Sequence, residues 1–400
     1  MAAPAARPDA MRRHNLSLVL SQVHRDGALT RAELTARLGL SRSTIGALVS
    51  DLAELGLVQE SVPSGGTRAG RPSHVVGPNP SGPFVVAVDV DVTHVTTAAI
   101  GLGGGVLARH VMQADPARPA TPEHVAEQIL GSVPTLRELA HMDAAPVCIG
   151  VSVPGTVDRH LGTVGFAPNL GWRDAAFGAM LTALSSPHVP VVVGNDADLA
   201  VFAEHSRGGG RGCDDLVFLM GRTGVGAGII VNGAPLRGHD GHAGEIGHNV
   251  VDVSGPRCHC GKRGCLETYV GDNALVALAG RRRRRDSDAT LVFESARDGD
   301  SRACVAVRKV AAALGRAIAG LVNTLNPERV LLGGSFGEVL DMASEDVLAA
   351  FDDYVLDAPG ETVLLSKPVL GEDSALIGAA EVAFAQLLND PLGGRALAAR

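Results

Sequence analysis

The sequence predicts two structures in series, an N-terminal winged helix-turn-helix and a larger α/β body. Helical apolar periods fill residues 12–52, whereas strand-like apolar runs alternate with helical stretches from Phe84 onward. Charge divides at the same place: residues 1–78 hold nine basic and six acidic residues, whereas residues 79–400 hold 26 and 37. Because the first part is net positive and the second net negative, we expect only the first to meet a polyanion.

The composition is that of a globular protein with more than one domain. The 400 residues suggest two or three domains, and 46% hydrophobic with 20% charged residues can build a sizeable core. Residues 1–10 are rich in Ala and Pro and hold no apolar run before a cleavage site, and no segment is long and apolar enough to span a bilayer. We therefore expect a cytoplasmic protein with no membrane partner, whose six cysteines are reduced or metal-bound.

Three helices are expected in the N-terminal part. The first runs from Arg12 to Arg25 and carries an apolar stripe. Thr30 and Glu33 form a Thr-x-x-Glu capping box that opens the second helix. Gly39 begins the turn before the third helix, for which Ser41 is the expected N-cap and Gly56 the stop. The expected core residues of the first and third helices are Leu16, Val19, Leu20, Val23, Ile45, Leu48, Val49 and Leu52.

The start of the third helix is the expected DNA-reading surface. Its exposed residues there are Ser41, Arg42, Ser43 and Thr44, whose side chains can reach phosphates and base edges in a major groove. Two short strands, 57–61 and 73–76, are expected to flank a basic wing that carries Arg68 and Arg71 along the backbone or into a minor groove. A helix-turn-helix module that binds protein instead of DNA is the alternative. The arginines of the wing favour DNA as the partner.

We expect the winged helix-turn-helix to span residues 11–76 and the α/β body to span residues 84–390. Residues 77–83 contain three prolines in seven positions and are expected to be a linker, because proline cannot continue a helix or a central strand. Five strands of the body are expected over residues 85–91, 147–153, 191–193, 216–220 and 330–332.

One histidine and three cysteines form a candidate metal site within eighteen positions. His248, Cys258, Cys260 and Cys265 are ligand types that suit zinc, and four protein ligands with no open position indicate a structural zinc ion. The Cys-x-Cys-x4-Cys spacing departs from the usual zinc-finger pattern. The alternative is an ordinary loop with free thiols.

Several blocks in the body resemble the ROK family, which groups sugar kinases with repressors that carry an N-terminal winged helix. The blocks are Ser152–Val157, Ala167–Trp172, Gly194–Asp198, Thr223–Gly228, Ala243–His248 and Cys258–Glu267. The last two are the most specific. The resemblance implies an actin-like (ribonuclease H-like) α/β fold of two lobes, about 84–195 plus the C-terminal helix and about 196–370, with a sugar at the cleft between them.

The resemblance also implies a set of residues that contact a hexose. By position they are Asn169, Asn195, Asp196, Glu245, His248 and Glu267, which offer the carboxylate and amide groups that vicinal hydroxyls require. The family pattern makes His248 and the three cysteines the zinc ligands, so zinc would hold the two glutamates toward the sugar. His248 would then serve metal and sugar through separate ring nitrogens. As alternatives, Asn195 could cap a helix, and Glu245 and Glu267 could be solvated loop acids.

The nucleotide-binding motifs depart from the family pattern, although Asp196 matches the catalytic base of the kinases. The Asp-x-Gly-Gly-Thr turn of the kinases reads Asp89-Val-Asp91-Val-Thr93 here, and a Gly-Thr-Gly turn begins with Arg222. An acid facing a triphosphate and the loss of turn glycines both oppose binding of ATP. The Leu332–Ser335 motif on the nucleotide side survives.

The sequence therefore predicts a sugar-responsive transcriptional repressor of carbohydrate-metabolism genes that is not an enzyme. Its expected partners are operator DNA, a sugar or sugar-phosphate effector and further copies of the chain, as a dimer or a dimer of dimers. Structural Zn²⁺ is the expected cofactor, and ATP with Mg²⁺ is not expected. The alternative is an active ATP-dependent hexose or N-acetylhexosamine kinase with a DNA-binding appendage, in which Asp196 would be catalytic.

Overall fold

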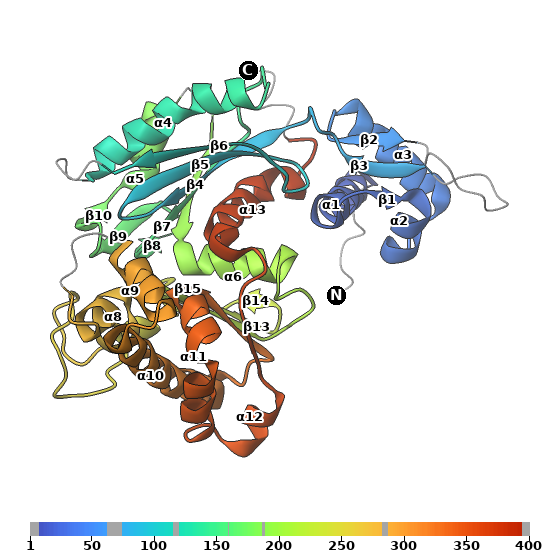
Figure 1. Ribbon diagram of the computed structural model, residues 1–400. Helices are drawn as coiled ribbons and strands as arrows, with labels where there is room; N and C mark the ends of the chain where they lie inside the picture. The colour runs from blue at the N-terminus through green and yellow to red at the C-terminus, as the bar shows by residue number, and fades with distance from the viewer. Residues whose placement is uncertain are drawn as a thin grey trace.

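The computed structural model describes residues 8–61, 74–114, 120–158, 160–185, 189–281 and 287–393, and Figure 1 shows a small head beside a body of two lobes. The head is built from three helices and a three-stranded sheet of order β1-β3-β2. In chain order its elements are α1 (Pro8–Asp26), β1 (Leu29–Thr30), α2 (Arg31–Leu38), α3 (Arg42–Glu54), β2 (Val58–Ser61) and β3 (Val75–Pro78).

The helices of the head begin and end at capping residues that can be identified in the sequence. Thr30 and Glu33 form the predicted capping box at α2, and Gly39 ends that helix with a φ of 66°. The hydroxyl of Ser41 accepts a hydrogen bond from the Thr44 backbone N–H at 3.1 Å, so Ser41 is the N-cap of α3. The eight core residues expected from the apolar stripes are all buried. Arg68 and Arg71 lie outside the described residues.

The expected linker over 77–83 is wrong at its first two positions. Gly77 and Pro78 belong to β3 and lie opposite Gln59 and Val58 of β2. Proline is accommodated because β1 pairs with β3 only at Val75 and Val76, so one edge of β3 is unpaired at Pro78. The side chain of Asn79 then donates a hydrogen bond to the Gly56 carbonyl at 2.8 Å, which fixes the start of the remaining connection.

The upper lobe contains a mixed five-stranded sheet of order β11-β7-β4-β5-β6. The parallel strands β4, β7 and β11 occupy one side of this sheet, and the β5–β6 hairpin completes the other. Helices α4 and α5 cover its outer face (Figure 1). The elements are β4 (Phe84–Val90), β5 (His94–Gly101), β6 (Val106–Gln113), α4 (Pro122–Leu139), β7 (Ile149–Val153), α5 (Phe177–Leu184) and β11 (Val191–Asn195), with a small sheet of β8 (Thr156–Asp158), β9 (Thr163–Ala167) and β10 (Trp172–Ala175).

The lower lobe contains a second five-stranded sheet, of order β14-β13-β12-β15-β16. Its outer face packs against the pair of long helices α10 and α11 (Figure 1). The elements are β12 (Leu216–Gly221), β13 (Val225–Val231), β14 (Ala234–Pro235), η1 (Ile246–His248), α7 (Glu267–Val270), α8 (Asp272–Leu278), α9 (Ser287–Arg297), α10 (Ser301–Leu325), β15 (Arg329–Gly334), α11 (Ser335–Asp352), α12 (Asp357–Thr362), β16 (Leu364–Ser366) and η2 (Gly371–Asp373).

Two helices, α6 (Asp196–Arg207) and α13 (Ser374–Asn389), lie between the two sheets (Figure 1). They pack closely, since a Cβ added at Gly378 of α13 would lie 2.0 Å from the Leu199 carbonyl oxygen of α6. The head shares a continuous apolar core with this region, because Leu20 and Val23 of α1 belong to the same buried cluster as Phe384 of α13. The winged head plus two-lobed α/β body confirms the predicted fold class.

Candidate functional site between the lobes

Polar side chains of the upper lobe meet where its parallel strands end. Asp89 of β4 lies opposite Ser152 of β7, and the Ser152 hydroxyl donates a hydrogen bond to the Asp89 carboxylate at 2.8 Å. Asn195 ends the adjacent strand β11. Because the carboxyl ends of neighbouring parallel strands meet at one edge of a sheet, these residues border the cleft between the lobes.

Asn195 is the N-cap of α6, as the alternative interpretation anticipated. Its side-chain oxygen accepts a hydrogen bond from the Asp198 backbone N–H at 3.0 Å, and its amide donates to the Gly155 carbonyl at 2.9 Å. The capping role does not exclude a sugar contact, because an amide oxygen has two lone pairs and an amide nitrogen two hydrogens. Contact between Asn195 and a sugar stays a prediction.

Asp196 is the first residue of α6 and is 8% exposed. Burial raises the pKa of its carboxyl group to about 7, and the attraction of Arg222 only partly opposes that rise. A carboxyl group that titrates near neutral pH can accept a proton from a sugar hydroxyl, so its local environment suits a general base as well as a hydrogen-bonding residue.

Glu245 and His248 owe their positions to two glycines that lie directly against β13. A Cβ at Gly244 would lie 2.3 Å from the Ala227 carbonyl oxygen, and a Cβ at Gly247 would lie 2.2 Å from that of Val225. Only glycine permits this approach. Glu245, the residue before the short helix η1, and His248, the last residue of η1, are therefore held close to β13.

The four predicted zinc ligands come together. One ligand atom from each of His248, Cys258, Cys260 and Cys265 lies within 4.8 Å of the others. The Cys260 and Cys265 sulfurs are 3.7 Å apart, too far for a disulfide and close to the edge, about 3.8 Å, of a tetrahedron with Zn–S bonds of about 2.3 Å. The donor set therefore fits a structural zinc ion.

His248 faces both the cysteine cluster and the cleft. Its Nδ1 lies 3.8 Å from the Cys258 sulfur, while its Nε2 lies 3.9 Å from a carboxylate oxygen of Glu245. A metal bond through Nδ1 would leave Nε2 for a ligand in the cleft. This arrangement suits the expected division of the two ring nitrogens.

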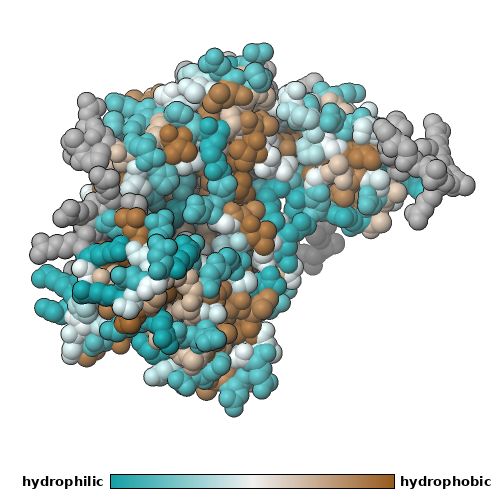
Figure 2. All heavy atoms as spheres, in the orientation of Figure 1, coloured by the Kyte–Doolittle hydropathy of each residue, from teal (hydrophilic) through white to brown (hydrophobic). Residues whose placement is uncertain are grey.

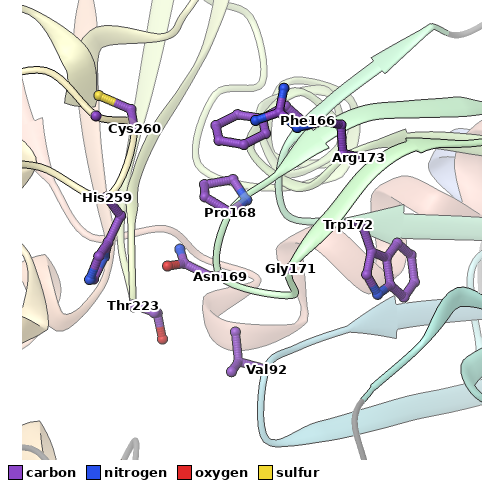
Figure 3. Close-up of a pocket in the computed structure, with 11 residues that line it drawn as sticks. Val92, Phe166, Pro168, Asn169, Gly171, Trp172, Arg173, Thr223, His259 and Cys260 are labelled. Atoms are coloured by element: carbon purple, nitrogen blue, oxygen red, sulfur yellow. The ribbon is translucent and has the colours of Figure 1, made fainter.

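Glu267 and Asn169 approach one another from opposite lobes. A Cβ added at Gly224 would lie 3.0 Å from a Glu267 carboxylate oxygen and 3.1 Å from the Asn169 amide nitrogen, so both side chains border that glycine. Beside them lies an open pocket of about 580 Å³, lined on one side by His259, Cys260 and Thr223 and on the other by residues of the upper lobe (Figure 3). Of the residues predicted to contact a hexose, Asn169 lines this pocket, whereas Asn195 and Glu245 line a second recess.

Asp198 is a further candidate that we did not select from the sequence. It lines a narrow recess together with Asn195 and Glu245, and burial raises the pKa of its carboxyl group to about 6. Glu245 adds to this rise, whereas Arg237 opposes it. In the sequence, Asp198 is marked only by its place in the Asn-Asp-Ala-Asp run. It stands two residues after Asp196, and residues at that spacing do not share one face of a helix.

Arg222 joins the two lobes at the other end of the cleft. It follows β12 of the lower lobe, and its guanidinium lies 3.2 Å from a carboxylate oxygen of Asp89 and 3.4 Å from one of Asp91, both on the upper lobe. Burial alone would lower the pKa of Arg222, but the carboxylates of Asp89, Asp91 and Asp196 outweigh it, so the pKa lies above its usual value. The side chain is a fixed cation bridging the lobes.

Arg222 and the two aspartates line a larger cavity of about 830 Å³, which also includes Gly334 and Ser335. A Cβ at Gly334 would lie 2.0 Å from the Gly221 carbonyl oxygen, which explains why a glycine with a φ of 60° stands at the end of β15. Figure 2 shows hydrophilic residues around the hollow between the lobes. Two carboxylates already paired with an arginine fit the phosphates of a magnesium nucleotide poorly.

The residues predicted to read DNA lie in the head, at the start of α3. Ser41, Arg42 and Ser43 are exposed and Thr44 is half-buried. Besides capping the helix, the Ser41 hydroxyl forms hydrogen bonds with the Ser43 hydroxyl at 2.9 Å and with the Thr44 hydroxyl at 2.8 Å. Contact between these four residues and DNA stays a prediction.

The fold and the site together define a two-lobed α/β protein with a winged-helix head, a cysteine–histidine cluster and a polar cleft. The chain belongs to the ROK family, whose model matches residues 85–386, and the MarR family model matches residues 17–69. The chain is 25% identical over 375 residues to the xylose repressor of Bacillus subtilis, covering 94% of this chain and 96% of that protein. It is also 34% identical over 245 residues to a glucokinase of Halalkalibacterium halodurans, covering 58% and 74%.

Solved structures show the same fold. A ROK family transcriptional regulator described as a homologue of the E. coli MLC protein superposes with a TM-score of 0.76 at 24% identity, covering 98% of this chain and all of that one. A ROK family glucokinase from Streptomyces griseus, solved with glucose and AMPPNP, gives a TM-score of 0.65 at 27% identity and covers 75% and 99%. None of the helices in the described ranges is long and apolar enough to cross a membrane.

Proposed function

We propose that the protein is a transcriptional regulator that binds operator DNA through its winged head and a sugar through the cleft, with repression relieved or imposed by the sugar. Support comes from both family matches and from the full-length similarity to a xylose repressor. The effector is a hexose, a pentose or a derivative of one, and the assembly is a homo-oligomer that presents two heads to two half-sites.

The observation that carries this proposal is the bridge from Arg222 to Asp89 and Asp91. The resemblance places glycine turns for nucleotide phosphates here, whereas this chain has an internal ion pair that uses the same space. Binding of a triphosphate would bring its negative charge against two aspartates and would have to separate them from Arg222. At the other end of the cleft, the pocket that Asn169 lines is open.

Zinc has a supporting role in this proposal. A zinc ion held by His248 and the three cysteines would fix the loop that carries Glu245 and leads into Glu267. The ion supplies no open coordination position in this scheme, so it binds no substrate. Its function is to hold acidic side chains in an orientation that suits sugar hydroxyls.

A gel-shift experiment on DNA from upstream of the protein's own gene tests the proposal. Thermal-shift screening first selects ligands from a panel that includes D-xylose, D-glucose and N-acetylglucosamine, since a ligand bound to the folded state raises Tm. We expect one of them to change the shifted fraction of DNA, and AMPPNP with Mg²⁺ to leave Tm unchanged. A chain that binds no sugar, or that binds sugar with no change in the gel shift, would be incompatible with a sugar-responsive regulator.

An ATP-dependent sugar kinase is the second candidate function. The buried Asp196, whose pKa is raised to about 7, is the observation that favours it, together with the similarity to glucokinases. A coupled assay for ADP formation with the same sugars tests this candidate. Turnover that disappears in Asp196→Asn would establish the kinase and would rank it above the regulator.

A further inference from the structure

Helix α6 spans from the candidate sugar site to the winged head. Its N-cap is Asn195, and Asp196 and Asp198 stand in its first turn, whereas Arg207 is its last residue. At 1.5 Å per residue, its twelve residues cover about 18 Å. A displacement at one end of so short a helix must therefore reach the other end.

Arg207 uses its whole guanidinium at the junction between head and body. Its Nε pairs with the carboxylate of Glu381 on α13, its Nη1 donates to the Gly103 carbonyl at 3.0 Å, and its Nη2 donates to the His24 carbonyl at 3.0 Å. His24 belongs to α1 of the head, and Gly103 belongs to the turn between β5 and β6 of the upper lobe. The side chain is 12% exposed.

The turn between β5 and β6 is shaped to receive this arginine. Gly103 and Gly104 have φ values of 97° and 83°, which side chains other than glycine rarely adopt. A Cβ at Gly104 would lie 2.8 Å from the Cζ atom of Arg207. The guanidinium thus lies directly on the backbone of the turn.

His24 closes a small buried network around Arg207. Its Nδ1 accepts a hydrogen bond from the Gly103 backbone N–H at 3.0 Å, so the proton of a neutral ring is on Nε2, which lies 3.3 Å from a Glu381 oxygen. His24 is 2% exposed and Glu381 is 8% exposed. Buried polar networks of this kind hold their members in one arrangement, because loss of any one bond leaves a desolvated polar group.

The same helix also holds the segment that enters α13. Glu204, one turn before Arg207, is fully buried and accepts hydrogen bonds from the backbone N–H groups of Val369 and Leu370 and from the Ser374 hydroxyl at 2.8 to 3.1 Å. Segments 369–374 and α13 join the lower lobe to the upper one. The end of α6 is therefore attached to the connection between the lobes and to the head at once.

We infer that α6 is the element that transmits occupancy of the sugar site to the DNA-binding head, and that Arg207 is the positioning residue at which the transmission leaves the body. The inference rests on the proposed function, since it supplies the physical connection that a sugar-responsive regulator needs. Sugar contacts at the start of α6 change the position of the helix, and the Arg207–Glu381–His24 network carries that change to α1.

The test measures the affinity of full-length protein for fluorescently labelled upstream DNA, with and without the sugar selected by thermal shift. In the wild type we expect the sugar to change the DNA Kd at least fivefold, the lower end of usual allosteric coupling. In Arg207→Gln we expect a change of less than twofold, while the sugar Kd measured by calorimetry stays within threefold of the wild-type value. A merely structural Arg207 would lower Tm and leave the sugar-induced fold-change intact.

Arg207→Gln leaves the buried Glu381 without the arginine that pairs with it, and this loss could prevent folding. Two further variants therefore test the inference independently of that variant. Arg207→Lys retains the charge, but an ammonium group lacks the planar guanidinium that bonds to three acceptors at once. The double variant Arg207→Gln with Glu381→Gln removes both charges. We expect both to fold and both to be uncoupled. The matched control is Arg211→Gln, which removes the exposed 2.6 Å ion pair between Arg211 and Asp26 at the same junction and should respond like the wild type.

Reciprocity supplies a second readout. Because coupling between two ligands is mutual, the wild-type sugar Kd must change with saturating DNA by the same factor, whereas in the uncoupled variants it should not change. Uncoupled variants together with a responsive Arg211→Gln would support the inference. If the wild type responds to sugar and the folded Arg207 variants respond equally, the inference is wrong but the proposed function stands. If the wild type responds to no sugar, both the proposed function and the inference are wrong.

Discussion

At the scale of single residues, Arg222 distinguishes this cleft most clearly from a nucleotide site. It pairs with Asp89 and Asp91 across the lobes and retains 27% exposure. The sequence shows that an arginine and an acid replace turn glycines, but it does not show that they face each other. That requires the end of β12 and the end of β4 to meet, which is a property of how the two sheets pack.

Replacing Arg222 should destabilise the protein, because Arg222→Gln leaves the carboxylates of Asp89, Asp91 and Asp196 close together without a cation. We expect a loss of about 2 kcal/mol in the free energy of unfolding at pH 8, below the ~3–5 kcal/mol of fully buried pairs because the site is partly solvated. Urea denaturation measures the loss. Unchanged stability would show that the bridge does not form in solution.

The pH dependence of stability tests the environment of Asp196. Its pKa is raised to about 7 when folded, from 3.8 when unfolded, so the folded state retains a proton that the unfolded state releases between those two values. Stability contributed by this group is therefore full below about pH 4 and is lost as the pH rises through about 7. Asp196→Asn should melt several degrees above the wild type at pH 8, and the two Tm values should converge toward pH 4. A difference that is constant with pH would contradict the raised pKa.

At the scale of elements, the loop from Ala243 to Glu267 could be predicted in its chemistry but not in its shape. Ligand types and spacing indicated zinc from the sequence alone, and the four side chains do converge. The isolated bridges between Val250 and Cys265 and between Arg257 and Arg263, which fold the loop back on itself, have no periodic signal in the sequence. Loops of this kind are set by tertiary contacts and by the metal rather than by local propensity.

Removal of the metal should loosen this loop and abolish the sugar response. Elemental analysis should find one zinc ion per chain, and Cys260→Ser should lower Tm by roughly 10 °C and prevent sugar binding in calorimetry. Cys304→Ser is the matched control, because Cys304 lies on α10 outside the cluster. Zinc-free protein that binds sugar normally would show that the cluster does not position the acidic residues.

The start of α3 is the element whose function can be tested apart from the cleft. Arg42→Ala should weaken binding of DNA of any sequence and reduce the slope of log K against log salt by about one, because it removes one phosphate contact. Fluorescence anisotropy over a range of salt concentrations measures that slope. Arg109→Ala, which removes a body arginine paired with Asp373, should leave binding unaltered. Equal effects of the two substitutions would indicate nonspecific charge rather than a reading helix.

At the scale of the whole molecule, the largest departure from the sequence-based prediction is the attachment of the head. Three prolines near residue 80 predicted a linker between head and body but no contact between them, whereas α1 shares its apolar core with α13 and its polar network with α6. Long-range packing of this kind leaves no mark on local periodicity, since the same buried leucines would fill the core of a detached head equally well. In the proposed function, this attachment would connect the sugar site to the DNA-binding head.

The central claim is that sugar in the cleft and DNA on the head influence each other's binding. The most direct measurement is the affinity of the wild-type chain for its own upstream DNA as sugar concentration increases, followed by fluorescence anisotropy. The account predicts a saturable change of at least fivefold in Kd, with a midpoint at the sugar Kd obtained by calorimetry. A DNA affinity that stays constant while the cleft becomes saturated with sugar would contradict it.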